Sequence, residues 1–139
     1  MTRRSFVSLL AVVLASLAAP VAAQNARIAV SIPYEFTAGN RKLAAGQYTI
    51  SRPVPSDPRV LAFRGDAKHQ KALVTTSRTA GEEMASDTEL VFARYGDLYF
   101  LRSIHIRGIR ERHEVPISKA EKAVAAKSAA VMVRLKAEQ

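Results

Sequence analysis

The sequence predicts a mostly β protein: a small antiparallel β-sandwich or partly open barrel with one C-terminal α-helix. Three observations lead to this fold class. Residues 28–36 alternate apolar and polar side chains with the period of two that a half-buried strand shows. Gly96-Asp97 is a two-residue turn signal between two apolar, β-rich runs, which predicts a hairpin. Residues 118–137 contain no Gly or Pro and are rich in alanine, which predicts a helix.

The first 23 residues have the three zones of a secretory signal peptide. Arg3 and Arg4 supply a positive charge, residues 6–17 are almost all apolar, and small residues precede the expected cleavage between Ala23 and Gln24. A retained membrane anchor is the alternative, but the apolar run is shorter than the roughly 20 residues that a spanning helix needs. The paired arginines also fit the start of a twin-arginine signal, so the export route stays open.

The length of 139 residues indicates one domain. We expect a signal peptide at residues 1–23, a β-sandwich domain at 24–116 and a C-terminal helix at 117–139. The chain contains no cysteine, which excludes disulfides, thiol nucleophiles and thiolate metal sites. The exported part is nevertheless long enough to fold on a hydrophobic core alone. Its expected location is periplasmic or extracellular.

The chain is basic, with 21 Lys and Arg against 12 Asp and Glu. Without the two arginines of the signal, 19 basic residues face 12 acidic ones, a net charge of +7. Outside the cytoplasm the expected partners of such a charge are anionic envelope polymers, lipid head groups or acidic envelope proteins, and not nucleic acid. The charges are spread along the chain, so the alternative is that they only keep the domain soluble.

The first strand, at residues 28–36, contains Pro33, which cannot donate a ladder hydrogen bond and therefore predicts an edge strand or a bulge. Further short strands are predicted at residues 47–51, 60–64 and 72–76. Residues 77–87 show little apolar pattern and predict a mobile loop.

The hairpin at residues 89–106 is the strongest β signal. If Tyr95 faces Leu98 across the Gly96-Asp97 turn, Phe92 faces Leu101. One face then carries Leu90, Phe92, Tyr99 and Leu101, and the other carries Val91, Tyr95, Leu98, Phe100 and Ile104. Because both faces are apolar, we expect a central hairpin that is covered on both sides.

The predicted helix begins with a capping box, in which Ser118 is the N-cap and Glu121 the third helical residue. It is expected to run to Ala137. A narrow apolar stripe near the helical period comprises Ala120, Val124, Val131 and Leu135. This stripe is a candidate cover for one face of the hairpin, and a docking role for the helix is the alternative.

A spaced motif occupies residues 36–50: Phe36-x-x-Gly39-x-x-x-Leu43-x-Ala45-Gly46-x-Tyr48-x-Ile50. With this motif, a later Phe100-Leu101 and a Ser118-x-x-Glu121 helix start, the chain resembles uncharacterised small secreted bacterial β-sandwich proteins. Ala44 departs from the proline usual at that position in them. The resemblance implies a sandwich fold and export, and it assigns no catalytic residue. From the residues themselves, Gly46 is expected at a positive φ or a close backbone contact.

No motif points to catalysis, a metal or a cofactor. His69, His105 and His113 lack the spacing of a metal site, although His105 and His113 could meet across a turn with Glu114 as third ligand. No nucleophile elbow or phosphate-binding glycine loop is present. The carboxylates that could form an acid–base pair lie in the predicted loop and at its end, and comprise Glu82, Glu83, Asp87 and Glu89.

The most concentrated surface feature is basic and comprises His105, Arg107, Arg110, Arg112 and His113. Guanidinium groups bind carboxylate and phosphate in bidentate fashion, so this segment is the candidate anion-binding site. The alternative is a charged edge strand that blocks sheet-to-sheet aggregation.

These observations favour a non-catalytic, exported envelope or secreted module with a basic surface for an anionic partner. A small exported hydrolase with an unrecognised site, and an accessory subunit of an envelope complex that docks through its helix, remain the alternatives.

Overall fold

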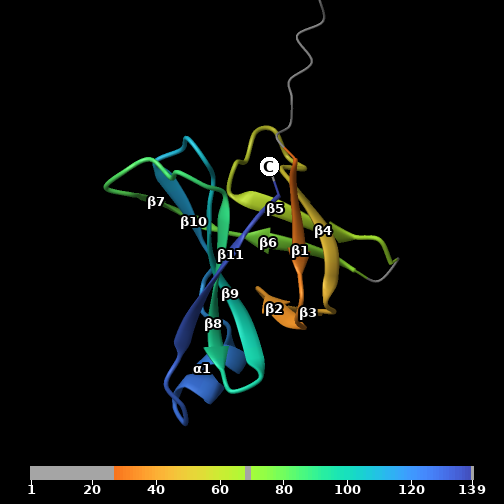
Figure 1. The fold of residues 1–139 in the computed structure, drawn as a ribbon, viewed down its shortest axis with the longest axis vertical. Helices are drawn as coiled ribbons and strands as arrows, with labels where there is room; N and C mark the ends of the chain where they lie inside the picture. Colours follow the sequence, from red (N-terminus) through yellow and green to blue (C-terminus); the bar gives the residue numbers. More distant parts are fainter. Residues whose placement is uncertain (1–26, 68–69, 139) are drawn as a thin grey trace, which may run out of the picture.

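The computed structural model describes residues 27–67 and 70–138. The predicted signal peptide and its cleavage site lie outside these residues. Within them, no helix has the length and apolar character needed to cross a bilayer. The fold is mostly β, with two sheets and one short helix, which confirms the predicted small β-sandwich, and the sheets of the described part do not close into a barrel (Figure 1).

The first sheet has the strand order β1-β4-β5-β6, and all its pairs are antiparallel. Its members are β1 (Ile28–Ile32), β4 (Gly46–Ser51), β5 (Val60–Gly65) and β6 (Lys71–Thr75). The strand that precedes Pro33 therefore lies at an edge, as predicted from that proline.

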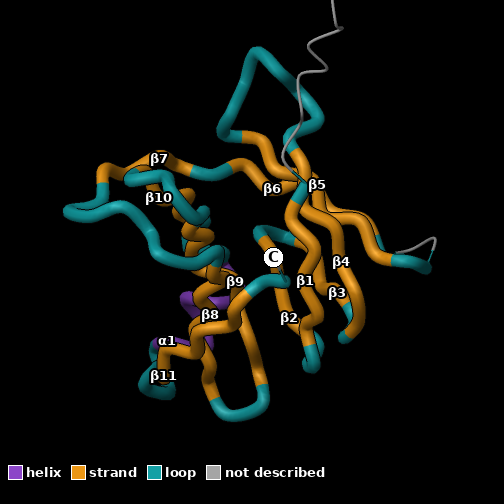
Figure 2. The backbone as a smooth tube through the Cα atoms, turned by 45° about the horizontal axis from the view of Figure 1, so that its top comes forward, coloured by secondary structure: helices purple, strands orange, loops and turns teal. Residues whose placement is uncertain are grey.

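The second sheet has the order β11-β8-β9-β10-β7 and packs against the first (Figure 2). Its members are β11 (Val131–Lys136), β8 (Glu89–Tyr95), β9 (Leu98–His105), β10 (Glu111–Glu114) and β7 (Ser77–Ala80). The small hairpin of β2 (Phe36–Ala38) and β3 (Arg41–Leu43) joins this sheet through one parallel bridge, from Thr37 to Phe100.

The core between the sheets centres on Phe36, a residue of the 36–50 motif. Its ring meets the rings of Tyr48 and Phe92 edge-on, at centroid distances of 5.4 and 5.6 Å. Such edge-to-face pairs add to the free energy gained by burying the rings. The Tyr48 hydroxyl donates to the Ala44 carbonyl at 2.6 Å, which satisfies the one polar atom of this ring. The motif thus supplies the middle of the core.

Two glycines of the motif have backbone angles that favour glycine. Gly39 has a φ of +60° in the turn between β2 and β3, and Gly46 opens β4 with a φ of +154°. A side chain at either position would be strained. The expectation for Gly46 is therefore confirmed. Leu43, the motif residue at the end of β3, is buried in the core.

The β8–β9 hairpin has the register predicted around Gly96-Asp97, with Tyr95 opposite Leu98 and Phe92 opposite Leu101. A bulge then shifts the register between Val91 and Phe92. Because one extra residue reverses the alternation of side chains, Ile104 faces the sandwich core and not the outer face. The prediction for Ile104 was therefore wrong.

The predicted C-terminal helix is much shorter than expected. Helix α1 spans Lys119–Ala125, and β11 follows it as an antiparallel partner of β8. The Ser118 Oγ accepts from the Glu121 amide at 3.2 Å, which confirms the N-cap. The division into a sandwich at 24–116 and a helix at 117–139 is therefore wrong, because residues 131–136 are part of the second sheet.

The chain changes sheets at a single residue. Strand β6 ends at Thr75 in the first sheet, and β7 begins at Ser77 in the second. The loop predicted at residues 77–87 thus starts with a strand that sequence reasoning missed. All four residues of β7 are exposed, so no apolar alternation could mark it.

The two ends of the described chain also meet. Glu138, after β11, donates its amide to the Ala29 carbonyl of β1 at 3.0 Å. This bridge ties the second sheet to an edge strand of the first.

Candidate functional site

The outer face of the second sheet is divided between an apolar half and a charged half. The apolar half consists of Ala93, Tyr95 and Phe100, and Val124 of α1 packs on it. The charged half begins beyond the bulge, where Glu89, His105 and Arg112 stand side by side on β8, β9 and β10. The expected cover on the second side of the hairpin is therefore present, but only over the apolar half.

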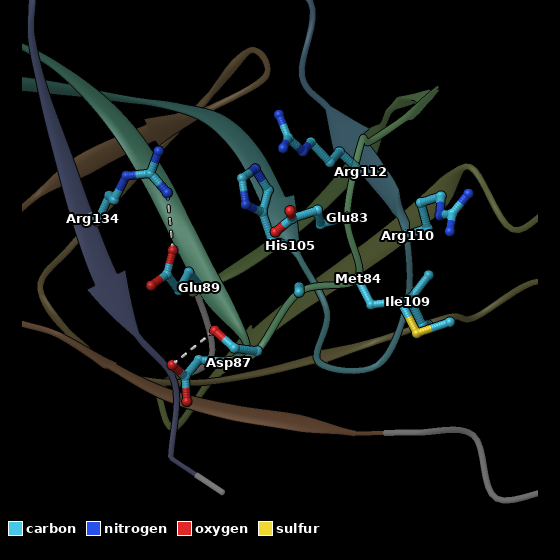
Figure 3. A pocket seen from close by; sticks show the side chains of 11 residues that line it. Glu83, Met84, Asp87, Glu89, His105, Ile109, Arg110, Arg112 and Arg134 are labelled. Carbon is cyan, nitrogen blue, oxygen red and sulfur yellow. Dashed lines mark hydrogen bonds and ion pairs between the residues drawn. The ribbon is translucent and has the colours of Figure 1, made fainter.

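A cleft of about 310 Å³ lies over the charged half (Figure 3). We call it the charged cleft, and the charged or titratable side chains that line it are Glu83, Asp87, Glu89, His105, Arg110, Arg112 and Arg134. Arg110 and Arg112 lie on one side, Glu89 and Arg134 on the other, and His105 lies between them in this view.

The loop at residues 81–88 forms part of the cleft wall and is tied to the loop before β10. The amides of Gly81 and Ala85 donate to the carbonyls of Arg110 and Ile109, at 3.0 and 3.3 Å. Gly108 donates its amide back to the Ala85 carbonyl at 2.9 Å. Gly108 has a φ of +76°, which an L side chain rarely adopts, so this glycine shapes the wall.

The charges of the cleft differ in how they are paired. Arg134 contacts the Glu89 carboxylate at 3.2 Å, and Lys136 contacts Asp87 at the same distance just outside the lining. Arg110 and Arg112 form no ion pair with any residue in the described part of the chain. The guanidinium groups from the β10 side are therefore available to a ligand, whereas the one from β11 is held by a carboxylate.

His105 is the titratable group in the middle of the charged half. Its Nε2 lies 3.2 Å from the Ser103 Oγ. Burial lowers the pKa of His105 below its usual 6.5, the nearby Arg112 and Arg134 lower it further, and Glu89 and Glu114 oppose the shift. These effects together favour the neutral form of the imidazole.

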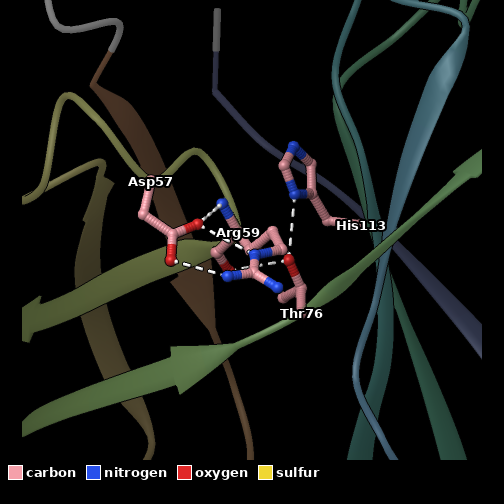
Figure 4. A network of polar contacts seen from close by, with 4 residues as sticks. All are labelled: Asp57, Arg59, Thr76 and His113. Carbon is pink, nitrogen blue, oxygen red and sulfur yellow. Dashed lines mark hydrogen bonds and ion pairs between the residues drawn. The ribbon is translucent and has the colours of Figure 1, made fainter.

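His113 does not belong to this surface. Its side chain is 1% exposed and points between the sheets, where Nδ1 lies 3.0 Å from the Thr76 Oγ1 (Figure 4). The same hydroxyl donates to the Arg59 carbonyl at 2.9 Å. Burial, followed by the charges of Arg52 and Arg78, lowers the pKa of His113. The histidine thus fixes the residue at which the chain changes sheets.

Of the five predicted anion-binding residues, the structure brings His105, Arg110 and Arg112 to the charged cleft. His113 was wrongly placed on the surface, because alternation along β10 turns it inward. Arg107 lies in the turn before β10 and is not a lining residue, although its amide donates to the Thr88 Oγ1 at 3.1 Å. The edge-strand alternative fails as stated, because β10 lies between β9 and β7.

Sequence reasoning missed Arg134, Asp87 and Glu89 as partners in one site. Arg134 was assigned to a helix, and the register of β11 against β8 is what carries it to Glu89. The only available signal was the β-branched pair Val131 and Val133 in the predicted helix, since such residues favour strands.

The charged cleft has two chemically useful features: guanidinium groups suited to an anion, and an imidazole beside a hydroxyl. Ser103 and His105 are within hydrogen-bonding distance, as a nucleophile and a base would be. Glu89, the carboxylate opposite His105, is however engaged by Arg134.

The described residues contain no group of three or more His, Asp or Glu that could hold a metal ion. His105 and His113 lie on opposite faces of the second sheet, so they cannot share a ligand.

Comparison with protein-family models, with curated proteins and with solved structures finds no match to this chain.

Proposed function

We propose that this protein is a non-catalytic, exported module that binds an anionic envelope polymer through the charged cleft. The observation that carries the proposal is the pair of arginines, Arg110 and Arg112, which line the cleft without an ion pair among the described residues. A guanidinium group that is free of carboxylates retains its full capacity for bidentate hydrogen bonds to an anion.

The carboxylates of the cleft restrict which anion is suitable. Glu83, Asp87 and Glu89 line the same space, so a densely charged polyanion would be repelled there. A polymer with separated carboxylates and intervening hydroxyl groups fits better, because its carboxylates can meet the arginines while its hydroxyls donate to the acidic side chains. An acidic polysaccharide has this chemistry.

The test is a calorimetric titration with polygalacturonate, a uronic-acid polymer, at several salt concentrations. We expect the double variant Arg110→Gln/Arg112→Gln to bind about tenfold more weakly, because two charge-assisted contacts are lost. The affinity of the wild type should fall with salt, since the attraction is screened over about 8 Å at physiological ionic strength.

The matched control is Lys119→Gln/Lys122→Gln, which removes the same charge from exposed positions of helix α1 outside the charged cleft and should bind as the wild type does. Equal losses in the two double variants would show that net charge alone attracts the polymer, and the proposed site would then be rejected.

A further inference from the structure

The outer side of the first sheet has a second hollow, of about 520 Å³, over β5 and β6. Its lining is partly apolar, from Pro53, Ala62 and Leu73, and partly basic. We call it the β6 groove. It is separate from the charged cleft, which lies on the second sheet and shares no lining residue with it.

The charge of the β6 groove is of one sign only. Arg41, Arg64 and Lys71 line it, and no Asp or Glu does. None of these three cations forms an ion pair with a residue in the described ranges. Arg64 and Lys71 are direct cross-strand partners, so two like charges face each other without a carboxylate between them. Such an arrangement costs free energy in the isolated protein and favours a negatively charged partner.

The groove also runs along an edge of the first sheet, where β3 approaches β6 without pairing with it. Strand β6 is the last of the first sheet, and β5 is its only ladder partner among the described residues. At one end of β6 the Gln70 carbonyl accepts from the Gly65 amide of β5, and at the other end the Thr76 amide donates to the carbonyl of Arg59, the residue before β5. Since antiparallel bonding alternates, Ala72 and Val74 bond to β5 as well, and the amides and carbonyls of Lys71, Leu73 and Thr75 point away from it.

Leu73 stands on this edge with 69% of its surface exposed, the highest value among the large apolar side chains described. Proteins usually protect an open edge with charges or proline and avoid large apolar groups there. Lys71 and Leu73 are two residues apart and therefore share the outer face. An added strand would meet one cation and one apolar side chain at a spacing of two.

We propose that the edge of β6 receives an acidic, extended segment of a partner protein as a further strand of the first sheet. The free amides and carbonyls of β6 supply main-chain hydrogen bonds, and the groove selects side chains at alternate positions. The segment carries a carboxylate opposite Lys71, within reach of Arg64, and an apolar residue opposite Leu73.

The test uses an end-capped, eight-residue peptide that alternates Glu with Val, titrated into the protein in solution. Binding should protect the amides of Lys71, Leu73 and Thr75 from hydrogen exchange, as followed by NMR. A peptide N-methylated at alternate residues, on the edge that would face β6, should bind about tenfold more weakly, because it cannot complete the ladder.

Two protein variants test the main-chain hydrogen bonds and the side-chain charges separately. Leu73→Pro removes an amide that is not bonded to β5, and Arg64→Gln/Lys71→Gln removes the charges without changing the backbone. Each should weaken binding about tenfold. The second variant and the N-methylated peptide still decide the outcome if Leu73→Pro lowers the melting temperature. Lys119→Gln/Lys122→Gln, on helix α1 and outside both sites, should bind the peptide as the wild type does.

Unchanged exchange at the three β6 amides would overturn the proposal, as would equal affinity for the N-methylated peptide. Binding of polygalacturonate that is lost in Arg64→Gln/Lys71→Gln, without amide protection, would show that the groove attracts polyanions through charge alone, and would overturn it too. None of these results bears on Arg110 and Arg112, so the polymer site in the charged cleft stands or falls separately.

Discussion

The two halves of the outer face of the second sheet are made from the same strands, but they differ in whether their charged side chains are paired. In the half under α1, Glu121 is only 3% exposed, yet both of its carboxylate oxygens have partners. The Tyr95 hydroxyl donates to one oxygen at 3.2 Å, and Arg102 meets the other at 3.4 Å. In the open half, Arg110 and Arg112 have no such partner among the described residues.

The bulge near Val91 sets the border between the two halves. It places Arg102 beside α1, so this arginine is used to neutralise a buried carboxylate. Buried charges must be paired because their desolvation is costly, whereas charges at a solvated cleft can remain available. The comparison therefore separates arginines that stabilise the fold from arginines that can bind a ligand.

The largest expected effect comes from breaking the covered half. Phe100 is 5% exposed and packs with Tyr95 beneath Val124, so Phe100→Ala should lower the free energy of unfolding by about 3–5 kcal/mol. Urea denaturation measures it. Leu98→Ala, at an exposed position of the same strand, is the control and should change stability by no more than about 0.5 kcal/mol. Similar losses in both variants would contradict the packing of α1 on this half.

A smaller effect is expected at the start of the covering helix. Ser118→Ala removes the acceptor for the Glu121 amide and should cost about 1 kcal/mol of stability. The control is Ser128→Ala, just beyond the helix, which should be neutral. If thermal melting of Ser118→Ala matches the wild type, the cap does not stabilise α1, and Glu121 must be positioned by Tyr95 and Arg102 alone.

The smallest effect is a pH dependence of stability, which distinguishes the buried His113 from His105 at the charged cleft. The pKa values of His105 and His113 are both lowered in the folded state, so the unfolded chain binds protons more readily. Stability is then fully present above about pH 6.5 and is lost as the pH falls through the folded pKa values. His113→Asn should flatten this dependence more than His105→Asn, because His113 is buried while His105 borders the cleft. Urea midpoints between pH 7.5 and 5 test it, and equal slopes in both variants would show that burial does not govern the shift.

The sequence predicted the β8–β9 hairpin down to the register at its turn, because Gly96-Asp97 and the alternation of large side chains act locally. It did not predict the side on which Ile104 lies. A bulge leaves no mark in the alternation until the pairing partner is known. The face on which a side chain lies can therefore be predicted from the sequence only as far as the first bulge.

The prediction for the second half of the helix failed for a different reason. Alanine-rich segments without glycine have high helix propensity, but propensity is a weak term that tertiary pairing can override. Residues 131–136 gain a full ladder with β8 and ion pairs from Arg134 and Lys136. For the same reason, only one side of the charged cleft could be predicted. The β10 side was visible as a run of arginines, whereas the β8 and β11 side exists only once the strands are paired.

The bridge between Ala29 and Glu138 makes the fold nearly cyclic. A short linker could join the two ends, and the chain could then be opened elsewhere without removing any strand from its sheet. The turn at Gly96-Asp97 is exposed, and opening it would leave β8 and β9 held by their other neighbours, β11 and β10. Circular permutants of this kind are tolerated where the new ends fall in exposed turns. The order in which the strands are synthesised is thus separable from the order in which they pack.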